Sequence, residues 1–158
     1  MTRALGRAGV QLLAACTIAL TGCGSSGSVS TSAYGGELRA ATSNLADLST
    51  DLTAATATGS PEQRATRLHA IQLGLRETGN QLDEVTAPAG LAKTHAELVA
   101  GVRDMADAID DLVQAEQLVA TDPERAKVLL RRFASDDSLP RVEAAAAKIT
   151  KAGVDAGF

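Results

Sequence analysis

The hydrophobic residues of this chain recur every three or four positions over most of its length, which predicts α-helices. A first helix is expected over 33–57 and a second from Pro61 to about Val85. Their apolar positions are Tyr34, Leu38, Ala41, Leu45, Leu48, Leu52 and Ala55 in the first, and Leu68, Ile71, Leu75, Thr78, Leu82 and Val85 in the second. Each series lies on one side of its helix, so both helices must bury that side against a neighbour.

Turn and capping residues separate these helices from the rest. Ser60 is a typical N-cap with Pro61 at the first helical position, and Gln63 completes a capping box. A second break falls at Thr86-Ala87-Pro88. The third helix is then expected over 89–120 and would be about 48 Å long. Its apolar side carries Leu91, His95, Leu98, Val102, Met105, Ile109, Leu112, Glu116 and Val119.

Two shorter helices are expected in the last part of the chain. Thr121 or Asp122 caps the first, whose apolar side holds Ala126, Leu129, Leu130 and Phe133. Ser135-Asp136-Asp137-Ser138 interrupts it, and Leu139, Val142, Ala146 and Ile149 follow on one side of the next. Together the two match one long leg, and short connections favour antiparallel neighbours. The pattern therefore predicts an all-α fold over 33–154: an antiparallel up-down four-helix bundle with a broken last leg.

The composition agrees with a helical fold. Only 2% of the residues are aromatic and 45% are hydrophobic, and alanine and leucine are strong helix formers. The scarcity of aromatic residues disfavours a β-sandwich, because aromatic and β-branched residues favour strands. The scarcity of aromatic platforms also disfavours saccharide binding.

The N-terminal residues have the layout of a secretory signal over 1–22. Arg3 and Arg7 precede an apolar run from Ala8 to Leu20, which is too short to span a membrane. The run ends in Leu20-Thr21-Gly22-Cys23, the lipobox pattern of a bacterial lipoprotein precursor, which predicts cleavage between Gly22 and Cys23. Leu13-Ala14-Ala15-Cys16 also fits that pattern. Cys23 is favoured because a polar tether, 23–32, follows it.

These residues predict a protein held at the extracytoplasmic face of the cell membrane by acyl chains, such as palmitate, on Cys23. One chain binds only marginally, but the two or three chains of such lipoproteins anchor stably. Removal of Arg3 and Arg7 takes the formal charge from −4 to about −6, so nucleic acid is not expected as a partner. Cys23 would be the last remaining cysteine, which excludes disulfides and thiolate metal sites.

Three groups of residues on the predicted helices can carry chemistry, and each has a simpler interpretation. His95 lies on an apolar side, but His69 should lie about 15 Å away along the helices, too far to share a metal ion. Asp104, Asp107 and Asp111, with Asp110 beside them, are expected to form a solvated acidic face. Glu116 is expected at the boundary of the apolar stripe.

A basic stretch on the fourth helix comprises Arg125, Lys127, Arg131 and Arg132, with Arg141 beyond it. Such a stretch can contact anionic lipid headgroups, although Glu124, Asp136 and Asp137 dilute its charge, and a mixed-charge surface is the simpler interpretation. No nucleophile motif and no phosphate-binding glycine loop occurs, so neither catalysis nor a cofactor or metal is expected.

The segment from Leu82 to Leu98 resembles a pattern found in small alanine-rich lipoproteins of actinobacteria: Leu-x-x-Val/Leu-x-x-Pro-x-x-Leu-x-x-x-His-x-x-Leu. This resemblance covers the signal, the tether and the junction of the second and third helices. It implies a bundle on the cell envelope and no particular reaction. It also suggests that His95 is a structural residue of the junction, bonded near the turn at 86–88.

The sequence thus yields two leading hypotheses and one weaker one. The first is a non-enzymatic module that docks another envelope protein. The second is a carrier or sensor of an amphiphilic ligand, held in a cavity left by an alanine-rich seam with Gly74, Gly79, Gly101 and His95. The weakest is a hydrolase or metal-dependent enzyme built on scattered acids.

Overall fold

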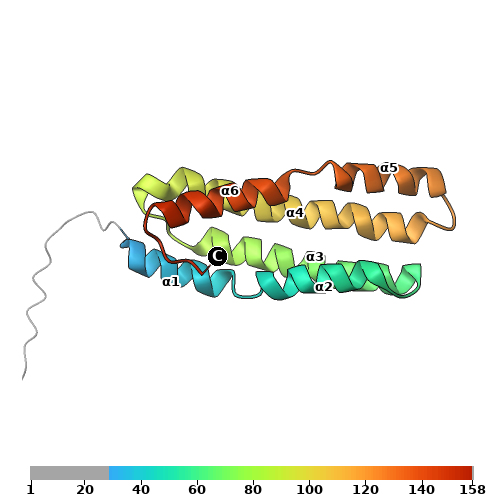
Figure 1. Ribbon diagram of the computed structural model, residues 1–158, viewed down its shortest axis with the longest axis horizontal. Coiled ribbons are helices and arrows are strands. Elements are labelled where there is room, and N and C mark those ends of the chain that lie inside the picture. Colours follow the sequence, from blue (N-terminus) through green and yellow to red (C-terminus); the bar gives the residue numbers. More distant parts are fainter. Residues whose placement is uncertain (1–28, 158) are drawn as a thin grey trace, which may run out of the picture.

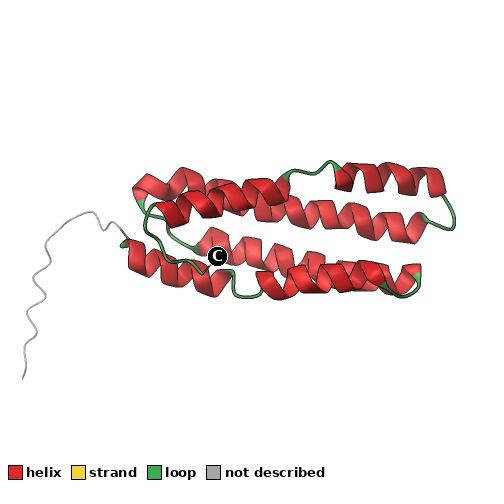
Figure 2. Cartoon of the chain, viewed as in Figure 1, coloured by secondary structure: helices red, strands yellow, loops and turns green. Residues whose placement is uncertain are grey.

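The computed structural model describes residues 29–157, and this part of the chain contains helices and no strands. The all-α prediction is thereby confirmed for these residues. The helices run along one common direction and form an elongated helical bundle with short loops at its ends (Figures 1 and 2). The bounds of the helices are α1 Thr31–Ala41, α2 Leu45–Ala57, α3 Pro61–Glu84, η1 (a single 3₁₀ turn) Ala89–Leu91, α4 Ala92–Leu118, α5 Pro123–Ala134 and α6 Ser138–Lys151.

The predicted caps are present where helices begin. Ser60 Oγ accepts a hydrogen bond from the Gln63 amide at 3.3 Å, and Gln63 Oε1 accepts one from the Ser60 amide at 3.0 Å. Asp122 caps α5 by accepting from the Arg125 amide at 3.0 Å. These bonds satisfy amides that have no partner within the helix.

The prediction of one continuous helix over 33–57 is wrong, because the chain breaks between α1 and α2 at residues 42–44. Thr42 and Ser43 donate side-chain hydrogen bonds back to Leu38 O and Ala40 O, at 2.9 and 3.0 Å. Asn44 Oδ1 accepts a hydrogen bond from the Thr78 hydroxyl of α3 at 2.9 Å. Short polar side chains of this kind compete with the helical backbone, so three in succession can end a helix.

α3 and α4 run antiparallel to each other, and so do α4 and α6, as the order of their ion pairs shows. Residues late in one helix pair with residues early in the next one. The pairs are Arg64–Glu116 (2.6 Å) and Asp83–Arg103 (3.0 Å) between α3 and α4, and Glu97–Lys148 (2.9 Å) and Asp104–Arg141 (2.7 Å) between α4 and α6. α4 is therefore the central helix, with α3 on one side and α5 and α6 on another (Figure 1).

The hydrophobic core is divided into a large cluster and a small one. The large cluster involves all helices except α5, which contributes only the half-buried Phe133 at its edge. The small cluster joins the end of α4 to α5 through Ala115, Ala126 and Leu129. The segment after α6 also belongs to the core, because Val154 and Ala156 are each 2% exposed. Gly35 allows this tail to approach α1, since a Cβ there would lie 2.6 Å from Asp155 O.

Two leucines expected on inner faces lie outside instead. Leu130 of α5 is 47% exposed and Leu139 of α6 is 53% exposed. α5 turns Ala126 and Leu129 toward α4, and Leu130 lies about 100° further around the helix. The break at Ser135–Asp137 has the predicted position, and α6 begins directly after it.

Candidate functional site: an apolar groove beside the helix breaks

An apolar groove of about 370 Å³ lies between α2 and the junction of α5 with α6. This volume falls within the range of small-molecule sites in proteins. The groove is lined by Leu45, Leu48, Ser49 and Leu52 of α2, Ile71 and Leu75 of α3, Val102, Met105, Ala108 and Ile109 of α4, Phe133 of α5, and Asp136, Ser138, Leu139, Pro140 and Val142 around the start of α6.

The floor of the groove is buried and apolar. Ile71 and Leu75 of α3 and Val102 and Ile109 of α4 are between 0 and 4% exposed. These side chains come from the two uninterrupted long helices, which pack against each other along most of their length. The floor is therefore set by the best-packed part of the bundle.

The walls come from the two interrupted legs. α2 packs on α3, whereas α5 and α6 pack on α4, and within residues 29–157 α2 makes no extensive contact with α5 or α6. Both breaks border the groove, because Leu45 follows the first and Asp136 lies in the second. The groove therefore exists because the outer legs do not close over the seam between α3 and α4.

Two glycines allow the walls of the groove to pack closely against its floor. A Cβ on Gly74 of α3 would lie 2.8 Å from Leu48 Cδ2, and one on Gly101 of α4 would lie 2.7 Å from Val142 Cγ2. Leu48 and Val142 both line the groove. The carrier hypothesis placed Gly74 and Gly101 in a seam that leaves a cavity. They provide close approach, and the groove lies beside them.

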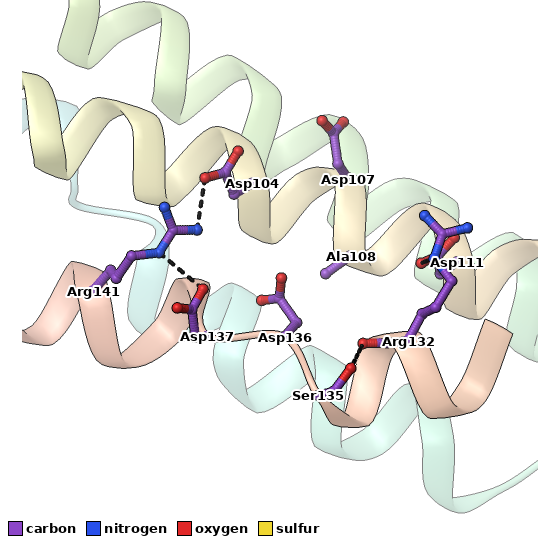
Figure 3. A pocket seen from close by; sticks show the side chains of 9 residues that line it. All are labelled: Asp104, Asp107, Ala108, Asp111, Arg132, Ser135, Asp136, Asp137 and Arg141. Atoms are coloured by element: carbon purple, nitrogen blue, oxygen red, sulfur yellow. Dashed lines mark hydrogen bonds and ion pairs between the residues drawn. The ribbon is translucent and has the colours of Figure 1, made fainter. Parts of the chain in front are cut away.

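A polar hollow of about 370 Å³ adjoins the groove, and the two share Ala108 and Asp136 (Figure 3). The predicted acidic face of α4 lies here, and three of its acids pair with arginines. Asp104 pairs with Arg141 (2.7 Å), Asp111 with Arg132 (3.4 Å) and Asp107 with Arg76 (3.5 Å). The hydrogen bond that Arg141 donates to Asp104 raises the pKa of Arg141.

The remaining acid of that group, Asp110, faces α3. It accepts hydrogen bonds from Gln72 at 2.9 Å and from Gln114 at 2.6 Å. Gln72 is 1% exposed, and its Oε1 lies 3.0 Å from His69 Nδ1. Asp110 thus satisfies a buried amide between α3 and α4.

His95 is buried at the opposite end of the bundle from α5, away from the groove. Its Nε2 donates to Leu82 O at 2.9 Å, because a carbonyl can only accept. Its Nδ1 must then accept from the Tyr34 hydroxyl, also at 2.9 Å. Burial is the main cause that lowers the pKa of His95, and it raises the pKa of Tyr34 to about 12.

Glu116 lies at the boundary between core and surface. Its carboxylate accepts a two-pronged hydrogen bond from Arg64 of α3, at 2.8 and 2.6 Å. The side chains are 19% and 24% exposed. This hydrogen bond raises the pKa of Arg64.

The residues that the sequence singled out as candidate site residues therefore lie in separate parts of the bundle and do not form one site. His69 is exposed on α3, and His95 is bonded to Tyr34 at the far junction. In residues 29–157 no group of three His, Cys, Asp or Glu side chains is arranged to hold a metal ion. Gly22, Cys23 and Cys16 lie outside the described residues.

Sequence reasoning missed the groove and the Tyr34–His95 bond. Both join residues far apart in the chain, and neither has a local pattern. The polar breaks at 42–44 and 135–137 were the available signs of the groove, but their alignment in space is set by tertiary packing.

Across residues 29–157, none of the helices is both long enough and apolar enough to cross a membrane. Comparisons of the chain with protein-family models, curated proteins and solved structures find no match.

Proposed function

We propose that this chain is a lipid-anchored bundle at the extracytoplasmic face of the cell membrane that carries an amphiphilic molecule. The aliphatic chain of that molecule occupies the groove between α2 and the α5–α6 junction. The observation that carries this proposal is the groove itself: about 370 Å³, with a buried aliphatic floor and apolar walls. The sequence alone favoured docking of an envelope protein; the groove gives the carrier hypothesis more support.

The arrangement of legs supports the same proposal. We infer an antiparallel up-down four-helix bundle whose first and last legs are both broken. In such a bundle the outer legs would normally meet and seal the seam. Here the break in each outer leg leaves that leg beside the seam between α3 and α4 and not over it. An apolar opening therefore remains at the breaks.

The charged residues at the rim of the groove indicate which headgroup the bound molecule would have. The groove has one charged lining residue, Asp136, and the adjoining hollow holds five aspartates and two arginines. A negative surplus at the rim disfavours an anionic headgroup. We therefore expect an uncharged or cationic head, with the chain in the groove.

We also propose that the protein is not an enzyme. The acids and histidines singled out by the sequence are held in structural contacts, such as Arg64–Glu116 and Tyr34–His95. These contacts support a scaffolding role for each of them.

The ligand proposal is tested by titrating the chain from Gly24 onward with N-phenyl-1-naphthylamine, an uncharged apolar fluorophore. All residues of both core clusters lie between Val29 and Ala156, so this chain contains the whole bundle. We expect a saturable rise in fluorescence. Dodecyltrimethylammonium, below its micelle concentration, should displace the probe better than dodecyl sulfate.

Ala108→Leu should weaken probe binding at least about tenfold, because the added methyl groups fill the groove. Ala100→Leu is the matched control, since Ala100 is an exposed residue of the same helix outside the groove. Absence of saturable binding, or equal effects of the two substitutions, would contradict the carrier proposal.

The anchoring proposal has a separate test. Cys23→Ser should abolish incorporation of labelled palmitate and release the protein from membranes, whereas Cys16→Ser should not. Loss of label in Cys16→Ser alone would move the cleavage site to Cys16.

A further inference from the structure

The outer surface of α5 combines the densest positive charge of the described chain with exposed apolar side chains. This α5 face consists of Arg125, Lys127, Val128, Leu130, Arg131 and Arg132, all of which are exposed. α5 carries four cations and one acid, Glu124, in a chain whose formal net charge is −4. The positive charge is therefore concentrated against the overall sign of the molecule.

Exposed apolar residues also lie on and near α5. Val128 and Leu130 are 45% and 47% exposed, and Val119, just after α4, is 44% exposed. These three are among only five large hydrophobic side chains exposed in residues 29–157. On the helix, Val128 is flanked by Arg125 and Arg131, three residues away on either side.

Much of the basic charge is available to a partner. Within residues 29–157 neither Arg125 nor Arg131 makes an ion pair. Lys127 pairs with Glu124 at 2.7 Å, but both side chains are mostly exposed, so that pair contributes little to stability. Arg132 pairs with Asp111 at 3.4 Å while remaining 67% exposed.

The packing of the inner side of α5 against α4 fixes the orientation of the α5 face. Ala126 and Leu129 pack on the end of α4 in the small core cluster, which fixes the helix and turns the opposite side outward. α5 lies at the end of the bundle opposite the start of α1 (Figure 1). None of the residues of the α5 face lines the groove, although Arg132 lines the adjoining hollow.

We propose that the α5 face binds the surface of an anionic lipid bilayer. Arg125, Lys127 and Arg131 contact phosphate headgroups, and Val128, which lies between Arg125 and Arg131 on the helix, enters the boundary between headgroups and acyl chains. Interfacial helices join apolar and basic side chains in this way, and each cation near an anionic surface adds to the attraction. With a second contact at the end of the bundle opposite the start of α1, the bundle would lie along the membrane.

The test is cosedimentation of the chain from Gly24 onward, which lacks the acylated cysteine, with lipid vesicles. We expect binding to vesicles of phosphatidylcholine mixed with phosphatidylglycerol, and not to phosphatidylcholine alone. High salt should weaken the binding because it screens exposed charges. Absence of binding to the anionic vesicles would overturn the proposal.

The double variant Lys127→Glu with Arg131→Glu should bind anionic vesicles at least about tenfold more weakly. Lys93→Glu with Lys151→Glu is the matched control: both are exposed lysines outside α5, and the net charge changes equally. Equal loss in both double variants would show a response to net charge only and would overturn the assignment to α5. Ala108→Leu should bind vesicles normally, so this test is independent of the groove.

Discussion

The Tyr34 hydroxyl donates a hydrogen bond to His95 Nδ1. This bond connects α1, the first helix of the described residues, to the junction of α3 and α4. Tyr34 is 0% exposed and His95 is 8% exposed, and their rings meet edge to face with centroids 5.6 Å apart. The bond from Nε2 to Leu82 O fixes the tautomer, so that Nδ1 depends on the Tyr34 hydroxyl. Two short side-chain contacts thus position three helices.

Tyr34→Phe should lower the free energy of unfolding by about 1–3 kcal/mol, because it leaves the buried Nδ1 of His95 without a donor. Urea denaturation monitored by circular dichroism measures the change. His95→Phe with Tyr34→Phe provides the control, since removal of both partners leaves no unsatisfied group. A Tyr34→Phe variant as stable as the parent chain would contradict a stabilising role for this hydrogen bond.

The lowered pKa of His95 makes stability depend on pH in one direction. In the unfolded chain this histidine titrates near its ordinary pKa of 6.5, whereas burial keeps it neutral in the fold, with Asp83 opposing the shift. The unfolded state therefore binds more protons as the pH falls, and stability that is present above about pH 6.5 is lost below it.

Urea midpoints should therefore decrease between about pH 7.5 and about pH 5.5, and His95→Gln should flatten that dependence. His69→Gln is the control, because His69 is exposed. A slope that depends on His69 and not on His95 would refute this explanation.

At the scale of elements, glycines decide how closely helices approach. Gly101 brings α6 against α4, where a Cβ would lie 2.7 Å from Val142 Cγ2 and 3.5 Å from the Val142 amide nitrogen. Gly36 of α1 has nothing within 4 Å of the corresponding position. The same residue type therefore has a packing role in one helix and none in another.

Gly101→Ala should destabilise the fold by about 1–3 kcal/mol, since overpacking against α6 outweighs the better helix propensity of alanine. Gly36→Ala should stabilise it by up to about 1 kcal/mol, because only the propensity changes. Thermal unfolding of both variants tests the contrast. Similar shifts of the two melting temperatures in the same direction would count against close approach at Gly101.

The helix boundaries show how far local patterns extend. The caps at Ser60 and Asp122 and the break at Ser135–Asp137 could be predicted because their hydrogen bonds join residues close in sequence. The break at 42–44 was missed because the apolar spacing continues through it. There, Asn44 bonds to Thr78 of α3, a contact that no local pattern contains.

At the scale of the whole molecule, the groove is an opening that the fold maintains at a cost in stability. Its floor is well packed, but its walls leave about 370 Å³ between them. Functional openings of this kind commonly trade stability for binding, so filling one tends to stabilise a protein.

Ala108→Leu should raise the free energy of unfolding by about 0.5–2 kcal/mol through added apolar contacts in the groove. Ala100→Leu, on an exposed part of α4, should stay within about 0.5 kcal/mol of the parent chain. Denaturant unfolding compares the two variants. Destabilisation by Ala108→Leu would mean that the walls cannot accommodate the extra volume, contrary to an open groove.

The sequence by itself determined the helical class, most helix boundaries and the polar break at 135–137, because apolar spacing, caps and turn residues act within a few positions. It also supplied the lipobox at Cys23, which stays a prediction. Tertiary structure alone decided that Tyr34 bonds to His95 and that three of the four aspartates of α4 pair with arginines. It also decided that the outer legs leave a groove between them. Each of those features joins residues that are tens of positions apart in the chain. Their geometry therefore forms only when α3 and α4 have packed together and the interrupted legs have packed against them.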